Sequence, residues 1–110
     1  ELKGKLIFLR QNYLETDGKS KQIKDLISRS LTAFISIFNA LIYLKKGIAP
    51  QRRRDTIKEL AGLFSVDAEI FSTCADIKEG LDKLSGTEIE SVFKKYLQEV
   101  EKICNIVDAL

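Results

Sequence analysis

The sequence predicts an all-α protein, an up-and-down four-helix bundle whose third leg is broken into two short helices. Residues 33–44 are apolar almost all the way round a helix, so neighbouring helices must cover more than half of this segment. The last segment, residues 87–110, repeats apolar side chains at spacings of four and three, which is typical of a bundle seam. Short connections make successive helices antiparallel. An irregular five-helix array is the alternative fold.

The composition indicates one compact helical domain. The chain has 110 residues, of which 45% are hydrophobic and 31% are charged, and this length supports one core but not two. Its formal net charge of +2 is close to neutral and does not favour a dedicated nucleic-acid binder. The chain contains no Met, so we do not expect Glu1 to be a translation start. We therefore expect residues 1–110 to form the C-terminal part of a longer protein.

The cysteines and the apolar run indicate a cytoplasmic protein with no membrane partner. Cys74 and Cys104 lie on apolar faces of predicted helices, where a free thiol behaves as a small hydrophobic group. A single pair of cysteines is not the disulfide framework of a small secreted domain. The longest apolar run, residues 31–44, is interrupted by polar residues and is shorter than the roughly 20 residues that a membrane-spanning helix needs.

The first two helices are predicted over residues 1–15 and from Ser20, the expected N-cap, to about Lys46. Gly18 is expected to end the first helix in a left-handed conformation, and Gly47 ends the second. The core face of the first helix consists of Leu2, Leu6, Leu9 and Tyr13. The core face of the second consists of Ile23, Ile27, Ser30, Leu31, Phe34, Phe38, Leu41 and Leu44, with Ile35, Ile37 and Ile42 beside it.

The third leg is predicted as two helices, residues 50–64 and 66–79, with Gly80 as the end of the second. Pro50 suits the first turn of the former helix, and Ser65 or Asp67 suits the N-cap of the latter. Their core faces consist of Ile57, Leu60, Ala61 and Phe64, and of Ile70, Phe71, Cys74 and Ile77.

The last helix has two candidate capping boxes. One pairs Thr87 with Glu90, and the alternative pairs Ser85 with Glu88. The seam of this helix consists of Ile89, Phe93, Tyr96, Val100, Ile103, Val107 and Leu110.

The side chains contain no recognisable catalytic or metal site. The chain has no His, which removes the commonest general base and metal ligand and any Ser-His or Cys-His nucleophile. It has no Gly-rich phosphate loop. Acidic pairs at helical spacing, such as Asp55 with Glu59 and Asp76 with Glu79, are interpreted as solvated faces. We expect no catalytic residue, no metal ion and no cofactor in this chain.

One cluster of cations flanks a single connection, and we call it the basic turn. It consists of Lys45, Lys46, Arg52, Arg53 and Arg54. The two lysines suit the negative end of the preceding helix, so one interpretation is dipole complementation and solubility. The other is an anion site for a nucleotide or another phosphate-bearing ligand, because Arg makes planar, bidentate contacts with phosphate.

A second stripe on the first helix, Gly4, Ile7, Gln11 and Leu14, lies nearly opposite its core face. Isolated exposed aliphatic residues are normal on a monomer. Gly4 favours an interface instead, because a glycine inside a helix costs about 1 kcal/mol relative to Ala and suits the close approach of another backbone. We expect this stripe to contact a missing domain or a second copy of the chain, and therefore predict a homodimer.

Three segments carry a resemblance to a known group of proteins. They are GKLIFLRQNYLE, DLISRSLTAFISIFNALIYLK and FKKYLQEVEKICNIVDAL. They resemble the helical region that follows the catalytic domain in bacterial and archaeal proteins with a nucleotidyltransferase domain of the DNA polymerase β superfamily. Related bundles are the C-terminal domain of kanamycin nucleotidyltransferase and the HEPN group. The resemblance implies a helical domain that binds substrate or forms a dimer, while a missing N-terminal nucleotidyltransferase domain holds metal and nucleotide.

The chain departs from these relatives at their catalytic motifs. It has no Gly-Ser turn followed by an Asp-x-Asp pair, and without His it has no Arg-x4-6-His motif of HEPN ribonucleases. The first hypothesis is therefore a non-catalytic accessory domain of a nucleotidyltransferase-type protein. The alternative is a stand-alone interaction module of a regulatory or toxin–antitoxin assembly.

Overall fold

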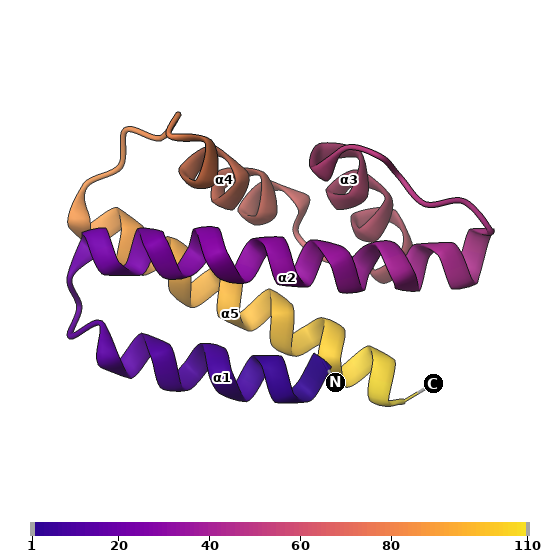
Figure 1. The fold of residues 1–110 in the computed structure, drawn as a ribbon, viewed down its shortest axis with the longest axis horizontal. Helices are drawn as coiled ribbons and strands as arrows, with labels where there is room; N and C mark the ends of the chain where they lie inside the picture. The colour runs from indigo at the N-terminus through magenta and orange to yellow at the C-terminus, as the bar shows by residue number, and fades with distance from the viewer. Residues whose placement is uncertain (1, 110) are drawn as a thin grey trace.

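The computed structural model describes residues 2–109 and contains five helices in that range (Figure 1). They are α1 (Leu2–Glu15), α2 (Ser20–Lys46), α3 (Arg53–Phe64), α4 (Ala68–Glu79) and α5 (Gly86–Asp108). No strand occurs among the described residues, so the all-α class is confirmed. The predictions that fall on residue 1 and on Leu110, the last position of the predicted seam, lie outside the described residues.

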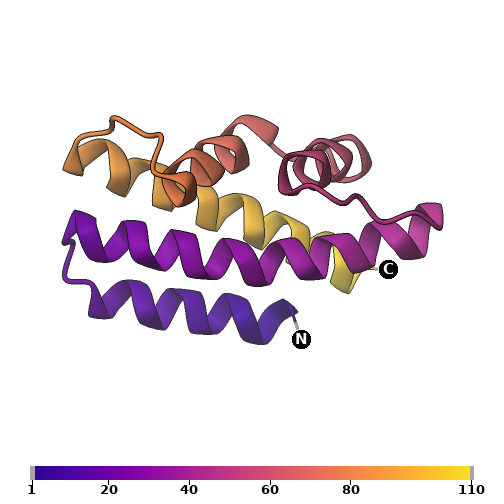
Figure 2. The same cartoon turned by 45° about the horizontal axis from the view of Figure 1, so that its top comes forward.

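The central helix is α2, as predicted. It packs against α1, α3, α4 and α5, whereas α1 packs mainly against α2 and α5. The long helices α1, α2 and α5 follow the long axis of a molecule whose extents are 40 × 27 × 19 Å (Figure 1). The short helices α3 and α4 lie together on α2, on the side away from α1 (Figure 2). The remaining face of α1 is consequently turned to solvent.

The start of α2 differs from its prediction by one residue. Its N-cap is Lys19 and not Ser20, because the Lys19 carbonyl already accepts a hydrogen bond from the Ile23 N–H at 2.9 Å. Ser20 is the first helical residue, and its side chain lies 3.7 Å from the place that a Cβ on Gly86 would take. The prediction of Ser20 as N-cap is therefore wrong. The prediction for Gly18 is confirmed, since its φ is 74°.

Pro50 lies outside α3, so its predicted place in the first turn is wrong. The first backbone hydrogen bond of this helix runs from the Thr56 N–H to the Arg52 carbonyl, at 3.0 Å. The Thr56 hydroxyl also lies 2.6 Å from Asn39 Oδ1 and donates to it, which ties the start of α3 to α2. Between α3 and α4 the chain turns at Ser65, whose φ of 54° is left-handed.

The capping box of α5 is the one from Ser85 and Glu88. The Glu88 N–H donates to Ser85 Oγ at 3.2 Å, and the Ser85 N–H donates to Glu88 Oε1 at 2.9 Å. Glu90 is used elsewhere, because its Oε2 accepts a hydrogen bond from the Tyr13 hydroxyl of α1 at 3.1 Å. The box predicted from Thr87 and Glu90 is therefore wrong, and the alternative is confirmed.

The core contains a cluster of buried aromatic rings from α2, α4 and α5. Phe71 of α4 meets Phe38 and Tyr96 edge-on, with ring centroids 5.8 and 6.0 Å apart. Tyr96 in turn meets Phe34 and Phe93 edge-on, with ring centroids 6.2 and 6.1 Å apart. Of the described seam positions, Ile89, Phe93, Tyr96, Val100 and Ile103 are buried, as are Cys74 and Cys104, whereas Val107 is half-buried and packs against the core. The predicted inward faces of α4 and α5 are therefore confirmed.

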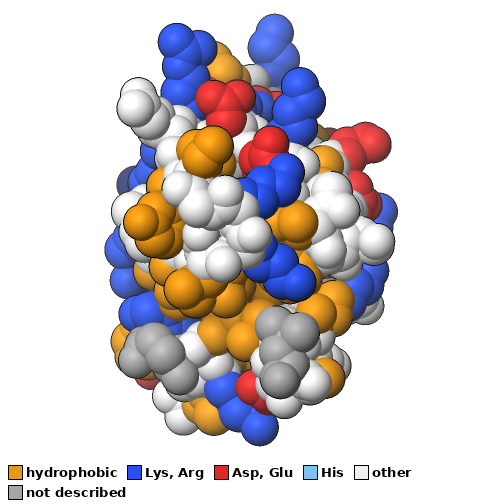
Figure 3. Space-filling view, turned by 90° about the vertical axis from the view of Figure 1, so that its right-hand side faces the viewer, with side chains coloured by type: hydrophobic (Ala, Val, Ile, Leu, Met, Phe, Trp, Pro, Cys, Tyr) orange, Lys and Arg blue, Asp and Glu red, His pale blue; other side chains and the backbone are white. Residues whose placement is uncertain are grey.

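Leu44 is wrong as a core position, because 80% of it is exposed. α2 extends beyond the start of α1, so its last turn has no helix beside it on that side (Figure 1). Ile48, which follows in the connection to α3, is 73% exposed. Figure 3 looks at this end of the molecule and shows hydrophobic side chains on its surface. Leu26 was not predicted in the core but is buried, at 4% exposure.

An ion pair fixes the α4–α5 connection to α2. Lys24 Nζ lies 2.9 Å from Asp82 Oδ2, and the Asp82 side chain is only 6% exposed. The hydrogen bond from Lys24, helped by the Leu84 N–H, lowers the pKa of Asp82 below its usual value, although burial opposes this shift. Asp82 therefore stabilises the folded chain above the pKa of the unfolded carboxyl, which is about 3.9.

We expect this contribution to disappear as the pH falls from about 4 through the lowered pKa of Asp82. Urea unfolding at a series of pH values should show that the free energy of unfolding of the wild type falls over this range. The fall should be smaller in Asp82→Asn. Asp25→Asn is the matched control, because the Asp25–Arg29 pair is 65% and 60% exposed and should contribute little. Equal pH dependence in the wild type and Asp82→Asn would contradict the assignment.

Candidate interaction surface

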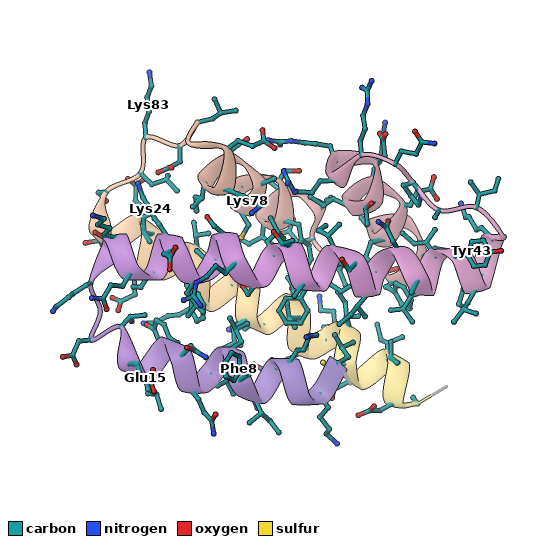
Figure 4. All side chains as sticks on the ribbon, in the orientation of Figure 1. Phe8, Glu15, Lys24, Tyr43, Lys78 and Lys83 are labelled. Carbon is teal, nitrogen blue, oxygen red and sulfur yellow. The ribbon has the colours of Figure 1, made fainter. Side chains whose placement is uncertain are left out.

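The second stripe of α1 lies on the surface, together with one residue that the stripe did not include. Ile7 is 49% exposed and Leu14 is 76% exposed, and Gly4 and Gln11 are also exposed. Phe8 is 64% exposed and belongs to the same side of the helix, four residues after Gly4. Figure 4 labels Phe8 and Glu15 along α1. We call Gly4, Ile7, Phe8, Gln11 and Leu14 the outer face of α1.

The outer face is held in place by the opposite side of α1. Leu2, Leu6 and Leu9 are buried there. The Tyr13 ring stacks on Phe93 of α5, with ring centroids 4.3 Å apart. Burial, and next the hydrogen bond to Glu90, raise the pKa of Tyr13, so its hydroxyl remains a donor at neutral pH.

Two ion pairs also join α1 to α5. Arg10 Nη2 lies 2.8 Å from Glu101 Oε2, and Lys3 Nζ lies 3.5 Å from Asp108 Oδ2. Both pairs are largely exposed, so they orient the side chains more than they stabilise the fold. The buried leucines and these pairs together present the outer face as a fixed surface.

Gly4 is not explained by packing inside the chain. A Cβ at this position would meet no atom within 4 Å. The residue is helical, and its φ is not in the left-handed range. A glycine inside a helix costs about 1 kcal/mol relative to Ala. The space above Gly4 is therefore open to a group from outside the chain.

A small groove between α1 and α2 borders the outer face. It has a volume of about 160 Å³ and is lined by Leu9, Leu26 and Phe34, which are buried, and by the exposed Phe8. A cavity of about 150 Å³ takes a group of the size of benzene. The groove is therefore large enough for one apolar side chain next to Phe8.

The basic turn does not bring all its cations to one site. Lys46 Nζ lies 2.6 Å from Glu59 Oε2 of α3. Arg53 Nη1 lies 3.0 Å from Glu79 Oε2, and Arg54 Nη2 lies 2.7 Å from Asp76 Oδ1. Lys45 and Arg52 are exposed, and neither side chain forms an ion pair or hydrogen bond with another described residue. Three of the five cations thus have a carboxylate partner.

The arginine contacts join α3 to α4. Arg54 Nη2 lies 3.1 Å from Glu79 Oε1 in addition to its contact with Asp76. The hydrogen bonds that Arg54 donates to Asp76, and next to Glu79, raise the pKa of Arg54. Asp76 and Glu79 thus keep partly exposed side chains, as the prediction of a solvated face requires, and they also hold arginines across the break in the third leg.

Other features contribute little to a site. Cys74 and Cys104 are free and buried, and burial raises the pKa of the Cys74 thiol. Within residues 2–109 no group of three or more His, Cys, Asp or Glu side chains is placed to hold a metal ion. By length and hydropathy alone, α2 is long and apolar enough to cross a membrane. The core helix of a soluble protein meets the same criteria. Residues 31–44 are shorter than a membrane span, but the whole helix of 27 residues is not.

Fold and surface together define an all-α protein with a fixed, partly apolar helix face exposed to solvent. Comparison with protein-family models, with curated proteins and with solved structures finds no match for this chain. The resemblance to nucleotidyltransferase-associated helical regions therefore stays a prediction.

Proposed function

We propose that the chain is a non-catalytic accessory domain of a nucleotidyltransferase-type protein and that it associates through the outer face of α1. The observation that carries the association is the exposure of Ile7, Phe8 and Leu14 on one side of a helix that is anchored on its other side, whereas the nucleotidyltransferase part rests on the resemblance. Contiguous exposed apolar side chains on a rigid element are typical of interaction sites. An open Gly4 in the same face supports a close helix contact.

The proposal includes the architecture of an up-and-down four-helix bundle whose third leg is broken into α3 and α4. Both short helices pack on α2, α4 also packs on α5, and the left-handed Ser65 marks the break. The contact between α3 and α4 favours the alternative, an irregular five-helix array. The angles at which α3 and α4 cross the other helices distinguish the two architectures, because legs of a bundle cross at about 20° from antiparallel.

The partner that the resemblance implies is a nucleotidyltransferase domain encoded before residue 1, in a cytoplasmic protein. Two buried free thiols agree with a reducing compartment. Reading the gene upstream of residue 1 for a Gly-Ser turn and an Asp-x-Asp pair tests this part of the proposal. An upstream region without an α/β catalytic domain would favour the alternative, a stand-alone interaction module of a regulatory or toxin–antitoxin assembly.

Sedimentation of the 110-residue chain tests association through the outer face. We expect a homodimer in the wild type and a folded monomer in Ile7→Glu/Leu14→Glu, because two buried charges would have no partner in the contact. Leu44→Glu/Ile48→Glu is the matched control, since it places the same charges on two exposed aliphatic residues of another surface. A monomeric wild type at high concentration, or a double variant at α1 that still dimerises, would refute the proposal.

A phosphate-bearing ligand is proposed for Lys45 and Arg52, the two cations of the basic turn whose side chains have no carboxylate partner among the described residues. Sulfate or a nucleotide at low salt should raise the melting temperature of the chain, since a ligand that binds only the folded state stabilises it. Lys45→Ala/Arg52→Ala should abolish that rise without disturbing the contacts of Arg53 and Arg54. If neither ligand raises the melting temperature of the wild type, the basic turn is interpreted as dipole complementation and solubility.

A further inference from the structure

The charges of α1 oppose the dipole of their own helix. Its first turn holds no acidic residue and its last turn holds no basic one. Lys3 and Lys5 lie instead at the positive end of the helix, and Glu15 lies at the negative end, followed by Asp17. Each of these placements is unfavourable within one helix. Lys3 contacts Asp108 of α5 at 3.5 Å, and a second helix that runs antiparallel to α1 along its exposed side would bring a further acidic residue, Glu15 of the other copy, to the lysine-bearing end.

The outer face has the same self-complementary order. Gly4 lies near one end and Leu14 near the other, with Ile7 and Gln11 between them. When two copies run antiparallel, Leu14 of one copy meets Gly4 of the other, and Ile7 meets Gln11. The 76% exposed Leu14 then fills the place where a Cβ on Gly4 would meet no atom of its own chain.

We propose that α1 pairs with α1 of a second copy of this chain, antiparallel about a two-fold axis, with each Leu14 seated over the Gly4 of the other copy. This inference rests on the proposed function and names its partner. The axis passes near the middle of the helix, so the two Phe8 rings meet beside it. The two Arg10 side chains also approach the axis, where each is neutralised by Glu101 of its own protomer at 2.8 Å.

A parallel pair lacks these advantages. It would set Lys3 and Lys5 beside their own copies and Glu15 beside Glu15, and would place Gly4 against Gly4. Like charges would then face each other at both ends, which is unfavourable. The charge pattern and the position of Gly4 thus select the antiparallel pair independently.

Disulfide trapping tests the register. Gly4→Cys and Leu14→Cys are made separately in the full chain, oxidised alone and as a mixture, and resolved on non-reducing gels. We expect cross-linked dimers chiefly in the mixture. Like positions in the antiparallel pair lie about 15 Å apart along the helix, whereas a disulfide requires Cα atoms within about 7 Å. The wild type is the control, because its Cys74 and Cys104 are buried.

Sedimentation of the same samples separates the possible failures. Cross-linking of Gly4→Cys alone or of Leu14→Cys alone as readily as the mixture would overturn the antiparallel register. An α1-dependent dimer whose mixture forms no cross-link would also overturn this inference but leave the proposed function intact. A wild type that is monomeric would refute both.

Charge exchange gives a second test that keeps Gly4 and Leu14. In the antiparallel pair, Lys5→Glu and Glu15→Lys should each raise the dimer dissociation constant several-fold, and the two together should restore it. In a parallel pair, each single substitution merely replaces one like-charged contact with another. Single variants with an unchanged dissociation constant would therefore overturn the proposed arrangement.

Discussion

Replacing Phe71 with Ala is expected to lower the free energy of unfolding by about 3–5 kcal/mol. Phe71 is fully buried and meets Phe38 of α2 and Tyr96 of α5 edge-on. It is the contribution of α4 to the aromatic cluster that joins three helices. Removing the ring leaves a cavity that the surrounding rings fill only in part, because interiors are close-packed.

Urea unfolding measures this loss, and Phe8→Ala is the matched control. Phe8 is 64% exposed, so the same change should cost the monomer far less while it weakens the α1 contact. Both substitutions are best compared in the Ile7→Glu/Leu14→Glu chain, where dimerisation does not contribute to stability. A smaller loss for Phe71→Ala than for Phe8→Ala would contradict the placement of the aromatic cluster in the core.

The inward faces of α2 and α5 could be predicted because helical periodicity is a local property of the sequence. The faces that carry Phe34 and Phe93 repeat over several turns, and both residues are buried. Periodicity does not reveal where a neighbouring helix stops. Leu44 continues the core face of α2 in spacing, but it is 80% exposed. The last turn of α2 extends past the N-terminal end of α1, so no helix covers it on that side (Figure 1).

The candidate interaction surface could be predicted in part for the same reason. The stripe through Ile7 and Leu14 follows from spacing alone, and both residues are exposed. The predicted stripe follows one row of side chains and does not include Phe8, although a residue four after Gly4 lies on the same side of a helix. Gly4 and Phe8 together would have indicated the wider face.

Contacts between distant segments could not be predicted from local pattern. Arg54 binds Asp76, which is 22 residues away and on another helix. The choice between the capping boxes of α5 depends on Tyr13, 77 residues before Glu90. Both boxes satisfy the local rule, but Glu90 accepts a hydrogen bond from α1, a contact that no local pattern shows, while Glu88 caps the helix.

The hydrogen bond between Ser30 and Tyr96 joins the helix seam of α5 to α2. Their hydroxyl oxygens lie 2.8 Å apart, and Tyr96 is fully buried. Ser30 Oγ also lies 3.3 Å from the Ile27 carbonyl and donates to it, so the Tyr96 hydroxyl is the donor to Ser30. Burial raises the pKa of Tyr96, which keeps this hydroxyl protonated at neutral pH.

Ser30→Ala is therefore expected to lower the free energy of unfolding by about 1–3 kcal/mol, because it leaves the buried Tyr96 hydroxyl without an acceptor. Ser36→Ala is the matched control, since Ser36 is exposed on the same helix and bonds only the Thr32 carbonyl; it reports the change in helix propensity alone. Adding Tyr96→Phe to Ser30→Ala removes the unpaired hydroxyl and should recover part of the loss in urea unfolding. Equal stability of Ser30→Ala with and without Tyr96→Phe would show that the hydroxyl finds another partner, and the bond would then not fix α5 on α2.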